Sequence, residues 1–107
     1  MENNYTVKIT PKAAGDLESI YIYISEELFA TSAATNILER IENGIMGLRE
    51  FPFSCNYVSD EYLKSKGYRK LIIDNYIVFY LIEDEEEKNQ VIIMRVLHGK
   101  QKYENLL

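Results

Sequence analysis

The spacing of the apolar residues changes once along this chain, from a helical period before residue 50 to strand-like patterns after residue 67. No other feature constrains the fold as strongly, because a face repeating at three and four residues packs as a helix and not as a strand. The first apolar face consists of Leu17, Ile20, Tyr21, Ile24 and Leu28, and the second of Ile37, Leu38, Ile41, Ile45 and Leu48. Thr10-Pro11 supplies a capping hydroxyl and a first-turn proline before the first helix. The short break near residues 30–32 predicts that the two helices form an antiparallel hairpin.

The remaining patterns predict four strands. Residues 5–9 alternate apolar and polar side chains, and three β-rich runs follow at residues 68–73, 76–82 and 91–97. Asp74-Asn75 suits a two-residue hairpin turn, and the acidic block at residues 83–87 is expected to form a second turn. Residues 49–67 carry loop signals, a length at which loops are often functional or contain short structure. The order β-α-α-β-β-β predicts a single α+β domain over residues 1–107, with the helical hairpin packed on a small, mostly antiparallel sheet.

Composition narrows the class of protein. The chain has 107 residues, one cysteine (Cys55) and one histidine (His98), so we expect no disulfide, no metal site and no cofactor. No apolar run approaches the length of a membrane span, and the polar, acidic start lacks the features of a signal peptide, so we expect a cytoplasmic protein with no membrane partner. The net charge of −5 argues against direct, sequence-specific DNA binding by this chain alone.

Charge is unevenly distributed, and this points to the C-terminal half. Residues 61–107 contain eight acidic and eight basic residues, but five of the acids form the block at residues 83–87. The candidate functional side chains in this half are Arg69, Lys70, Arg95, His98, Lys100, Lys102 and Tyr103. Arg69 and Lys70 are adjacent on a strand, so only one of them can share a face with Arg95. A cationic surface here could stabilise a transition state or hold an acidic peptide, and an ordinary solvated sheet edge is an equally good interpretation.

Five segments in register resemble the RelE/ParE toxin superfamily. Residues 10–25 resemble its opening helix, and residues 68–71, 76–80 and 95–99 resemble its strands. The segment Lys102-Tyr103-Glu104-Asn105-Leu106-Leu107 resembles its tail. The resemblance extends from about Tyr5 to Leu107. It implies the toxin of a bacterial type II toxin–antitoxin system of the plasmid-stabilisation type, neutralised by a cognate antitoxin.

The superfamily contains two kinds of toxin, and the resemblance is closer to the ParE-like kind. RelE-like members cleave mRNA on the ribosome without a metal, and in this chain the corresponding catalytic set would be Arg69, Arg95, His98 and Tyr103. ParE-like members inhibit DNA gyrase by binding it. Nucleases typically carry an arginine where this chain has Ile77 and another where it has Gln101, so the cationic clamp is depleted. Whether the chain is an enzyme, or an inactive homologue, is left open by the residues.

The first hypothesis is therefore a toxin that binds a target such as DNA gyrase through its C-terminal half. The residues expected to contact that target are Lys70, Arg95, Lys100, Lys102 and Tyr103. The alternative is the ribosome-dependent endoribonuclease. For both, we expect the groove between the helical hairpin and the sheet to receive the antitoxin, as an amphipathic helix or as an added strand.

Overall fold

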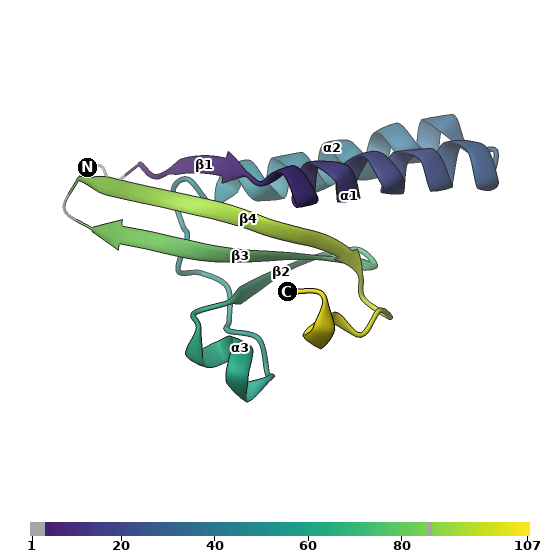
Figure 1. Ribbon diagram of the computed structural model, residues 1–107. Coiled ribbons are helices and arrows are strands. Elements are labelled where there is room, and N and C mark those ends of the chain that lie inside the picture. The colour runs from purple at the N-terminus through teal and green to yellow at the C-terminus, as the bar shows by residue number, and fades with distance from the viewer. Residues whose placement is uncertain (1–3, 86) are drawn as a thin grey trace.

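The computed structural model describes residues 4–85 and 87–107, which form a sheet of four strands covered on one face by two long helices (Figure 1). The elements follow the order β1 (Thr6–Ile9), α1 (Pro11–Ile22), a π-helical turn (Tyr23–Glu27), α2 (Thr31–Gly47), α3 (Glu61–Ser65), β2 (Arg69–Ile73), β3 (Tyr76–Glu85), β4 (Lys88–His98) and a 3-10 turn (Tyr103–Asn105). This confirms the predicted α+β class and the β-α-α-β-β-β order. Within the described ranges, no helix has the length and apolarity needed to cross a membrane.

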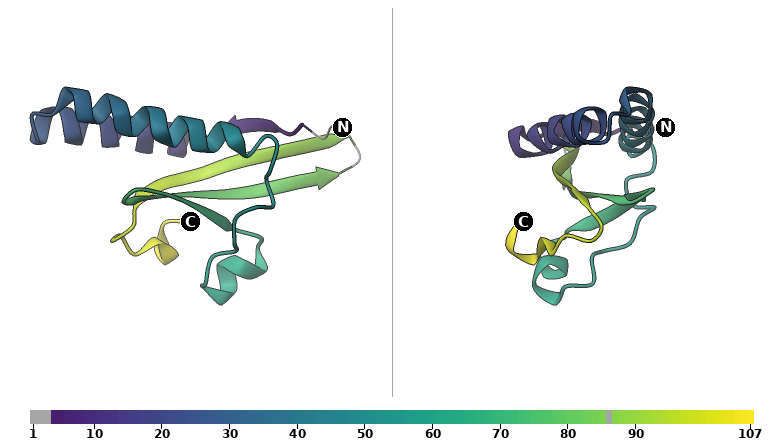
Figure 2. Two further views of the ribbon diagram at one scale, coloured as in Figure 1. Left: turned by 180° about the vertical axis from the view of Figure 1, so that it is seen from behind. Right: turned by 90° about the vertical axis from the view of Figure 1, so that its right-hand side faces the viewer.

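The start of α1 joins the helical layer to the sheet. The Thr10 hydroxyl accepts a hydrogen bond from the backbone N–H of Ala13 (3.2 Å) and donates to the carbonyl of Ile93 in β4 (2.9 Å). One side chain therefore caps the helix and ties it to the last strand. Beyond this point the ends of α1 and α2 that are joined to each other project past the sheet (Figure 2).

The strands lie in the order β1-β4-β3-β2. The hairpins β2–β3 and β3–β4 are antiparallel, whereas β1 pairs in parallel with β4, with Val7 opposite Val91. Asp74 adopts a φ of 55° in the turn between β2 and β3, as the Asp-Asn pair predicts. The register of β3 with β4 shifts between Phe79 and Tyr80, which leaves Met94 as an extra residue in β4.

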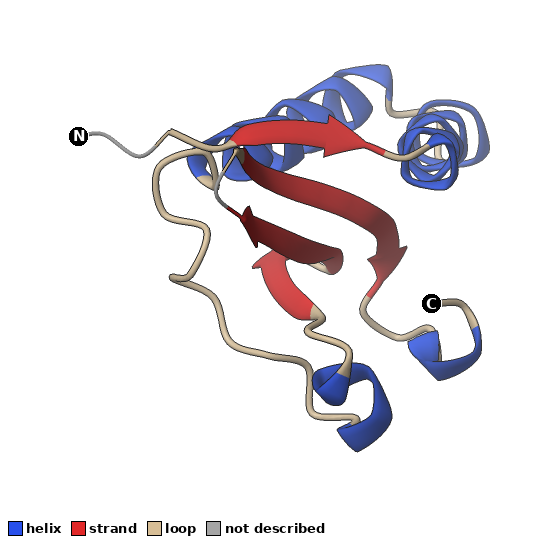
Figure 3. Ribbon diagram, turned by 60° about the vertical axis from the view of Figure 1, so that its left-hand side comes forward, coloured by secondary structure: helices blue, strands red, loops and turns tan. Residues whose placement is uncertain are grey.

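The sheet separates two apolar cores. Val78, Tyr80 and Ile93, none of which is exposed, pack with the helices on one face. Phe79 and Leu97 point to the other face. On that face the core is covered only by short segments of the described chain, α3 and the C-terminal tail, which lie on the side opposite the helices (Figure 3). We call this opposite side the second face. Burial of one large apolar side chain contributes roughly 1.5–3 kcal/mol to the free energy of unfolding. The core on the helical side contains more buried side chains than the core on the second face, so it contributes more to stability.

Two predictions about local structure are wrong. The acidic block is not simply a turn: Glu83, Asp84 and Glu85 belong to β3 and pair with Gln90, Asn89 and Lys88, while Glu86 lies outside the described residues. Strand pairing continues through these acids because their backbone groups bond to β4 and their side chains find partners or solvent: Asp84 accepts a hydrogen bond from the Tyr5 hydroxyl (3.1 Å), and Glu85 is exposed. Tyr21, expected in the core, is 39% exposed, because the π-helical turn follows it at the projecting end of the hairpin.

Candidate functional site

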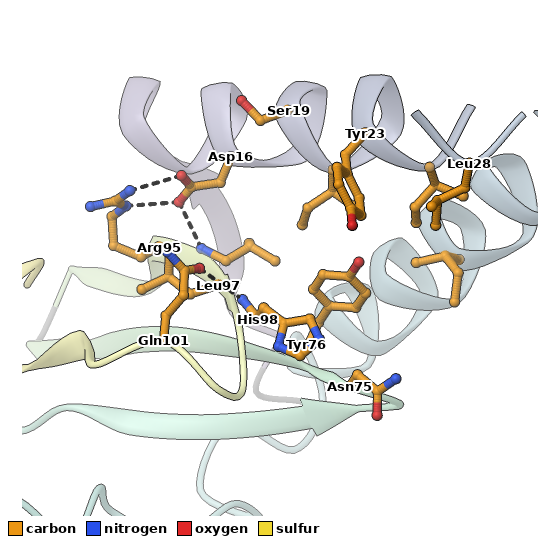
Figure 4. Close-up of a pocket in the computed structure, with 14 residues that line it drawn as sticks. Asp16, Ser19, Tyr23, Leu28, Asn75, Tyr76, Arg95, Leu97, His98 and Gln101 are labelled. Atoms are coloured by element: carbon orange, nitrogen blue, oxygen red, sulfur yellow. Dashed lines mark hydrogen bonds and ion pairs between the residues drawn. The ribbon is translucent and has the colours of Figure 1, made fainter. Parts of the chain in front are cut away.

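A groove of about 850 Å³ lies between the projecting half of the helical hairpin and the adjoining ends of β3 and β4. We call it the hairpin groove. Its helical wall is mainly apolar, with Ile20, Ile24, Leu28 and Ile37 beside the polar Asp16, Ser19 and Tyr23. Its sheet wall is mainly polar, with Tyr76, Arg95, His98 and Gln101 beside the apolar Val96 and Leu97. In Figure 4, Tyr23, Leu28 and Tyr76 lie around one space, whereas the Arg95 side chain turns toward Asp16. An apolar wall facing a polar one suits an amphipathic ligand.

Arg95 is held by Asp16 of α1 in a two-pronged ion pair. Its Nε donates to Asp16 Oδ2 (2.7 Å) and its Nη2 to Asp16 Oδ1 (2.8 Å), and the two side chains are only 17% and 13% exposed. A third donor, Nη1, reaches the carbonyl of Leu106 in the tail (3.0 Å). The hydrogen bonds that Arg95 donates to the Asp16 carboxylate raise the pKa of Arg95, against the opposing effect of burial. The guanidinium charge is therefore neutralised within the chain.

Asp16 also closes the exposed edge of β4. β1 ends at Ile9, opposite Ile93, so among the residues that the structure describes β4 has no strand partner on that side from there to His98. Asp16 Oδ2 accepts the backbone N–H of Val96 (2.9 Å), and the Gln101 side chain accepts that of His98 (3.1 Å). Two outward backbone donors that would otherwise pair with an incoming strand are thus already satisfied.

His98 presents a hydrogen-bond donor to the hairpin groove. Its Nδ1 accepts the backbone N–H of Lys100 (3.1 Å), so the proton of the neutral imidazole resides on Nε2. The ring packs edge-on against Tyr76, with 5.4 Å between the ring centroids. An imidazole fixed in this way can donate a hydrogen bond through Nε2.

Two phenols face each other across the groove. The hydroxyls of Tyr23 and Tyr76 point toward one another in Figure 4. Burial, and secondly the nearby Tyr23, raise the pKa of Tyr76. The Tyr76 hydroxyl therefore stays protonated at neutral pH and can donate or accept a hydrogen bond with a ligand.

Most of the residues predicted to contact a target lie on or near the second face. Lys70 is in register with Phe79, and the ring of Tyr103 packs on Phe79 with 4.8 Å between centroids. Lys100 and Lys102 are exposed in the segment that leads from β4 into the tail. Arg95 stands at the sheet edge between the two faces, joined to the tail through Leu106.

Arg69 lies apart from the other candidates. It begins β2 and is in register with Tyr80, at the opposite end of the strand from the turn that adjoins His98. Its Nη1 donates to the carbonyl of Cys55 (2.7 Å), and the guanidinium stacks over the rings of Tyr57 and Phe53, at 4.1 and 5.2 Å from their centroids. The Arg69 guanidinium therefore holds the loop that precedes α3 against the start of β2.

The structure therefore brings only part of the predicted catalytic set together. Arg95 and His98 line the hairpin groove, Tyr103 packs on the second face, and Arg69 stands at the far end of β2. Sequence reasoning missed Asp16 and Gln101. A signal for Asp16 existed, because it lies three residues after Ala13 and four before Ile20 and so shares the buried stripe of α1. In the described ranges, no group of three or more His, Cys, Asp and Glu side chains could hold a metal ion.

The fold defines a class of small α+β domains in which a helical hairpin crosses a sheet that ends in a short tail. Residues 7–103 match the family described as ParE toxin of the type II toxin–antitoxin system parDE, so this chain belongs to the ParE toxin family, within the RelE/ParE superfamily. A search of the curated proteins finds no match.

Solved structures agree on the fold. A chain of the chromosomal ParDE system from P. aeruginosa superposes with a TM-score of 0.73 at 19% identity, covering 92% of this chain and 100% of that one. A chain of the toxin–antitoxin complex RelBE2 from Mycobacterium tuberculosis gives 0.65 at 24% identity, covering 89% and 98%. The YoeB/ParE toxin from Agrobacterium tumefaciens gives 0.60 at 13% identity, covering 87% and 97%.

Proposed function

We propose that this ParE-family toxin arrests growth by binding DNA gyrase rather than by cleaving RNA. The observation that carries the proposal is the engagement of Arg95 by Asp16, which leaves the one strand arginine beside His98 without free charge. A ribonuclease needs that charge at the scissile phosphate, where loss of one such contact costs about 3–4 kcal/mol of transition-state stabilisation. Arg69 and Tyr103 stand away from His98 and do not replace it.

The test compares two purified target reactions. We expect the toxin to inhibit supercoiling by gyrase, and to leave mRNA intact on ribosomes programmed with a defined message. The double variant Lys100→Glu/Lys102→Glu reverses two exposed charges and should weaken the inhibition, with Lys88→Glu, at the far end of β4, as the matched control. Cleavage of ribosome-bound mRNA that is lost in His98→Ala and Tyr103→Phe would establish the ribonuclease instead. A chain with neither activity would be an inactive homologue.

The hairpin groove is the proposed site for a cognate antitoxin. Because Asp16 and Gln101 already cap the outward N–H groups of Val96 and His98, the groove favours an amphipathic helix over an added strand. The apolar side of that helix would pack on Ile24, Leu28 and Ile37, and its polar side would meet Tyr76 and His98.

Leu28→Glu tests this assignment, because Leu28 lines the groove and is already 54% exposed, so its replacement spares the core. We expect the affinity for the antitoxin encoded beside the toxin to fall at least about tenfold, or 1.4 kcal/mol, by calorimetry. Met46→Glu, 47% exposed on α2 and outside the groove, is the control and should bind normally. If the wild type, Leu28→Glu and Met46→Glu bind the antitoxin with equal affinity, the antitoxin binds outside the hairpin groove.

A further inference from the structure

The tip of the helical hairpin carries a side chain whose position the fold itself does not explain. Phe29 follows the π-helical turn with a φ of 52°, in the left-handed region. The backbone N–H of Ala30 donates to the carbonyl of Ile24 (3.2 Å), so Phe29 occupies the place after a helix end where glycine is the usual residue. A bulky aromatic residue in this conformation is sterically disfavoured.

No internal packing offsets that disfavoured conformation. Phe29 is 91% exposed, whereas Tyr62, the next most exposed large hydrophobic residue in the described chain, is 67% exposed. An aromatic ring held away from its own molecule at the end of a projecting hairpin is placed to enter a pocket of another molecule. Figure 2 shows that this end lies beyond the sheet, where a concave partner can approach it.

The charge around Phe29 indicates what that pocket looks like. The segment of residues 21–36 contains Glu26 and Glu27 and no lysine, arginine or histidine. Both glutamates are exposed and lie within three residues of Phe29. A complementary partner therefore offers an apolar pocket rimmed by Lys or Arg.

Phe29 also lies outside the hairpin groove, although its neighbour Leu28 lines it. A ligand that fills the groove can cover Leu28 and leave Phe29 uncovered. We infer that Phe29 is an anchor for the toxin's target, inserted into an apolar pocket with a basic rim, and that it acts separately from antitoxin binding. The inference rests on the proposed function, because it assumes that the toxin arrests growth by binding a target protein.

The experiment uses Phe29→Ala and Phe29→Gly, with Phe51→Ala, 66% exposed and distant in sequence, as the matched control. Three quantities are measured: the induction needed for growth arrest in cells without antitoxin, the affinity for the antitoxin, and the melting temperature. We expect both Phe29 variants to need at least about tenfold more toxin for arrest, as for loss of a binding hot spot. They should keep wild-type antitoxin affinity, and Phe29→Gly should melt at or above the wild-type temperature.

The double variant Glu26→Lys/Glu27→Lys reverses the charge of the hairpin tip and leaves Phe29 in place, and we expect a similar loss of growth arrest. A photo-crosslinking amino acid at position 29 should capture a gyrase subunit in cells. Arrest at the wild-type dose by the Phe29 variants would overturn the inference, and so would loss of antitoxin affinity, which would assign the tip to the antitoxin.

The two proposals fail in different ways. In one case the wild type arrests growth and the Phe29 variants do not, but the wild type leaves purified gyrase unaffected. Phe29 is then the anchor, and gyrase is the wrong target. If the Phe29 variants inhibit gyrase as the wild type does, gyrase stands and the anchor is wrong. A wild type that does not arrest growth overturns both.

Discussion

At the scale of single residues, Asp16 has the largest set of consequences. It pairs with Arg95, accepts the N–H of Val96, and is mostly buried. Removing one partner of such a pair leaves the other charge and a backbone donor without compensation. We expect Asp16→Ala to lower the free energy of unfolding by about 2–4 kcal/mol in guanidinium titrations.

The control is a second substitution that removes the orphaned charge. Asp16→Ala/Arg95→Met should recover part of the lost stability, since it leaves no unpaired guanidinium. If Asp16→Ala alone unfolds like the wild type, Arg95 is not held by this carboxylate, and the main observation against a ribonuclease is lost.

Tyr80 sets an alkaline limit on stability. Burial, and secondly the nearby Cys55, raise the pKa of Tyr80, whose hydroxyl donates to the carbonyl of Pro52 (2.8 Å). The unfolded phenol ionises near pH 10, so its contribution is complete below that pH and is lost as the pH rises toward the folded pKa. The free energy of unfolding should fall above about pH 10 by up to about 1.4 kcal/mol per pH unit for each such tyrosine.

Urea titrations between pH 8 and pH 11 measure this slope. Burial also raises the pKa of Tyr5 and Tyr76, so Tyr80→Phe should reduce the slope without abolishing it. A slope unchanged in Tyr80→Phe would mean that this phenol ionises as readily in the folded state as in the unfolded one.

At the scale of elements, Thr10 joins a helix start to a strand. We expect Thr10→Ala to lower the free energy of unfolding by about 1–2 kcal/mol, because the N-cap contact to Ala13 and the bond to Ile93 are lost together. Thr10→Ser keeps the hydroxyl and should retain most of the stability. Protection from hydrogen exchange at the first turn of α1 should decrease from the wild type through Thr10→Ser to Thr10→Ala. Equal protection in these three proteins would contradict the prediction.

The elements that periodicity defines were predictable, and those set by distant contacts were not. The two helices follow from the spacing of their apolar side chains, which pack on one sheet face. The cores of β3 and β4 follow from near-continuous apolar runs, because these strands bury side chains on both faces. The extension of β3 through Glu83 follows from pairing with β4, which no local pattern encodes. α3 is a single short turn capped by Asp60, too brief for a periodic signal.

The candidate site was harder to predict for the same reason. Arg95 and His98 were found because they are charged or titratable residues near the end of a strand. Their partners were not, since Asp16 lies 79 positions from Arg95 in sequence and meets it only through packing of α1 on β4. The separation of Arg69 from His98 depends on strand register, which a list of basic residues does not contain.

At the scale of the whole molecule, the C-terminal tail is part of the second core. Tyr103 and Leu107 pack against the group that includes Phe79 and Leu97, both almost fully buried. We expect truncation after Gly99 to expose both side chains, lower the free energy of unfolding by about 2–4 kcal/mol, and increase binding of a hydrophobic dye. The exposed pair Lys100→Glu/Lys102→Glu should do neither, which makes it the better test of target binding. A truncated chain as stable as the wild type would show that the tail does not cover this core.

The pairing of β1 with β4 has a consequence for the order in which the fold is completed. The first strand finds its place only beside the last one, with Thr6 opposite Gln90 and Ile9 opposite Ile93. Such distant pairing delays completion of the sheet until β4 has been made. β4 is the last of the four strands in sequence, so the sheet is complete only when β4 is free to pair with β1. A polypeptide interrupted before β4 therefore lacks the strand that holds β1 in the sheet.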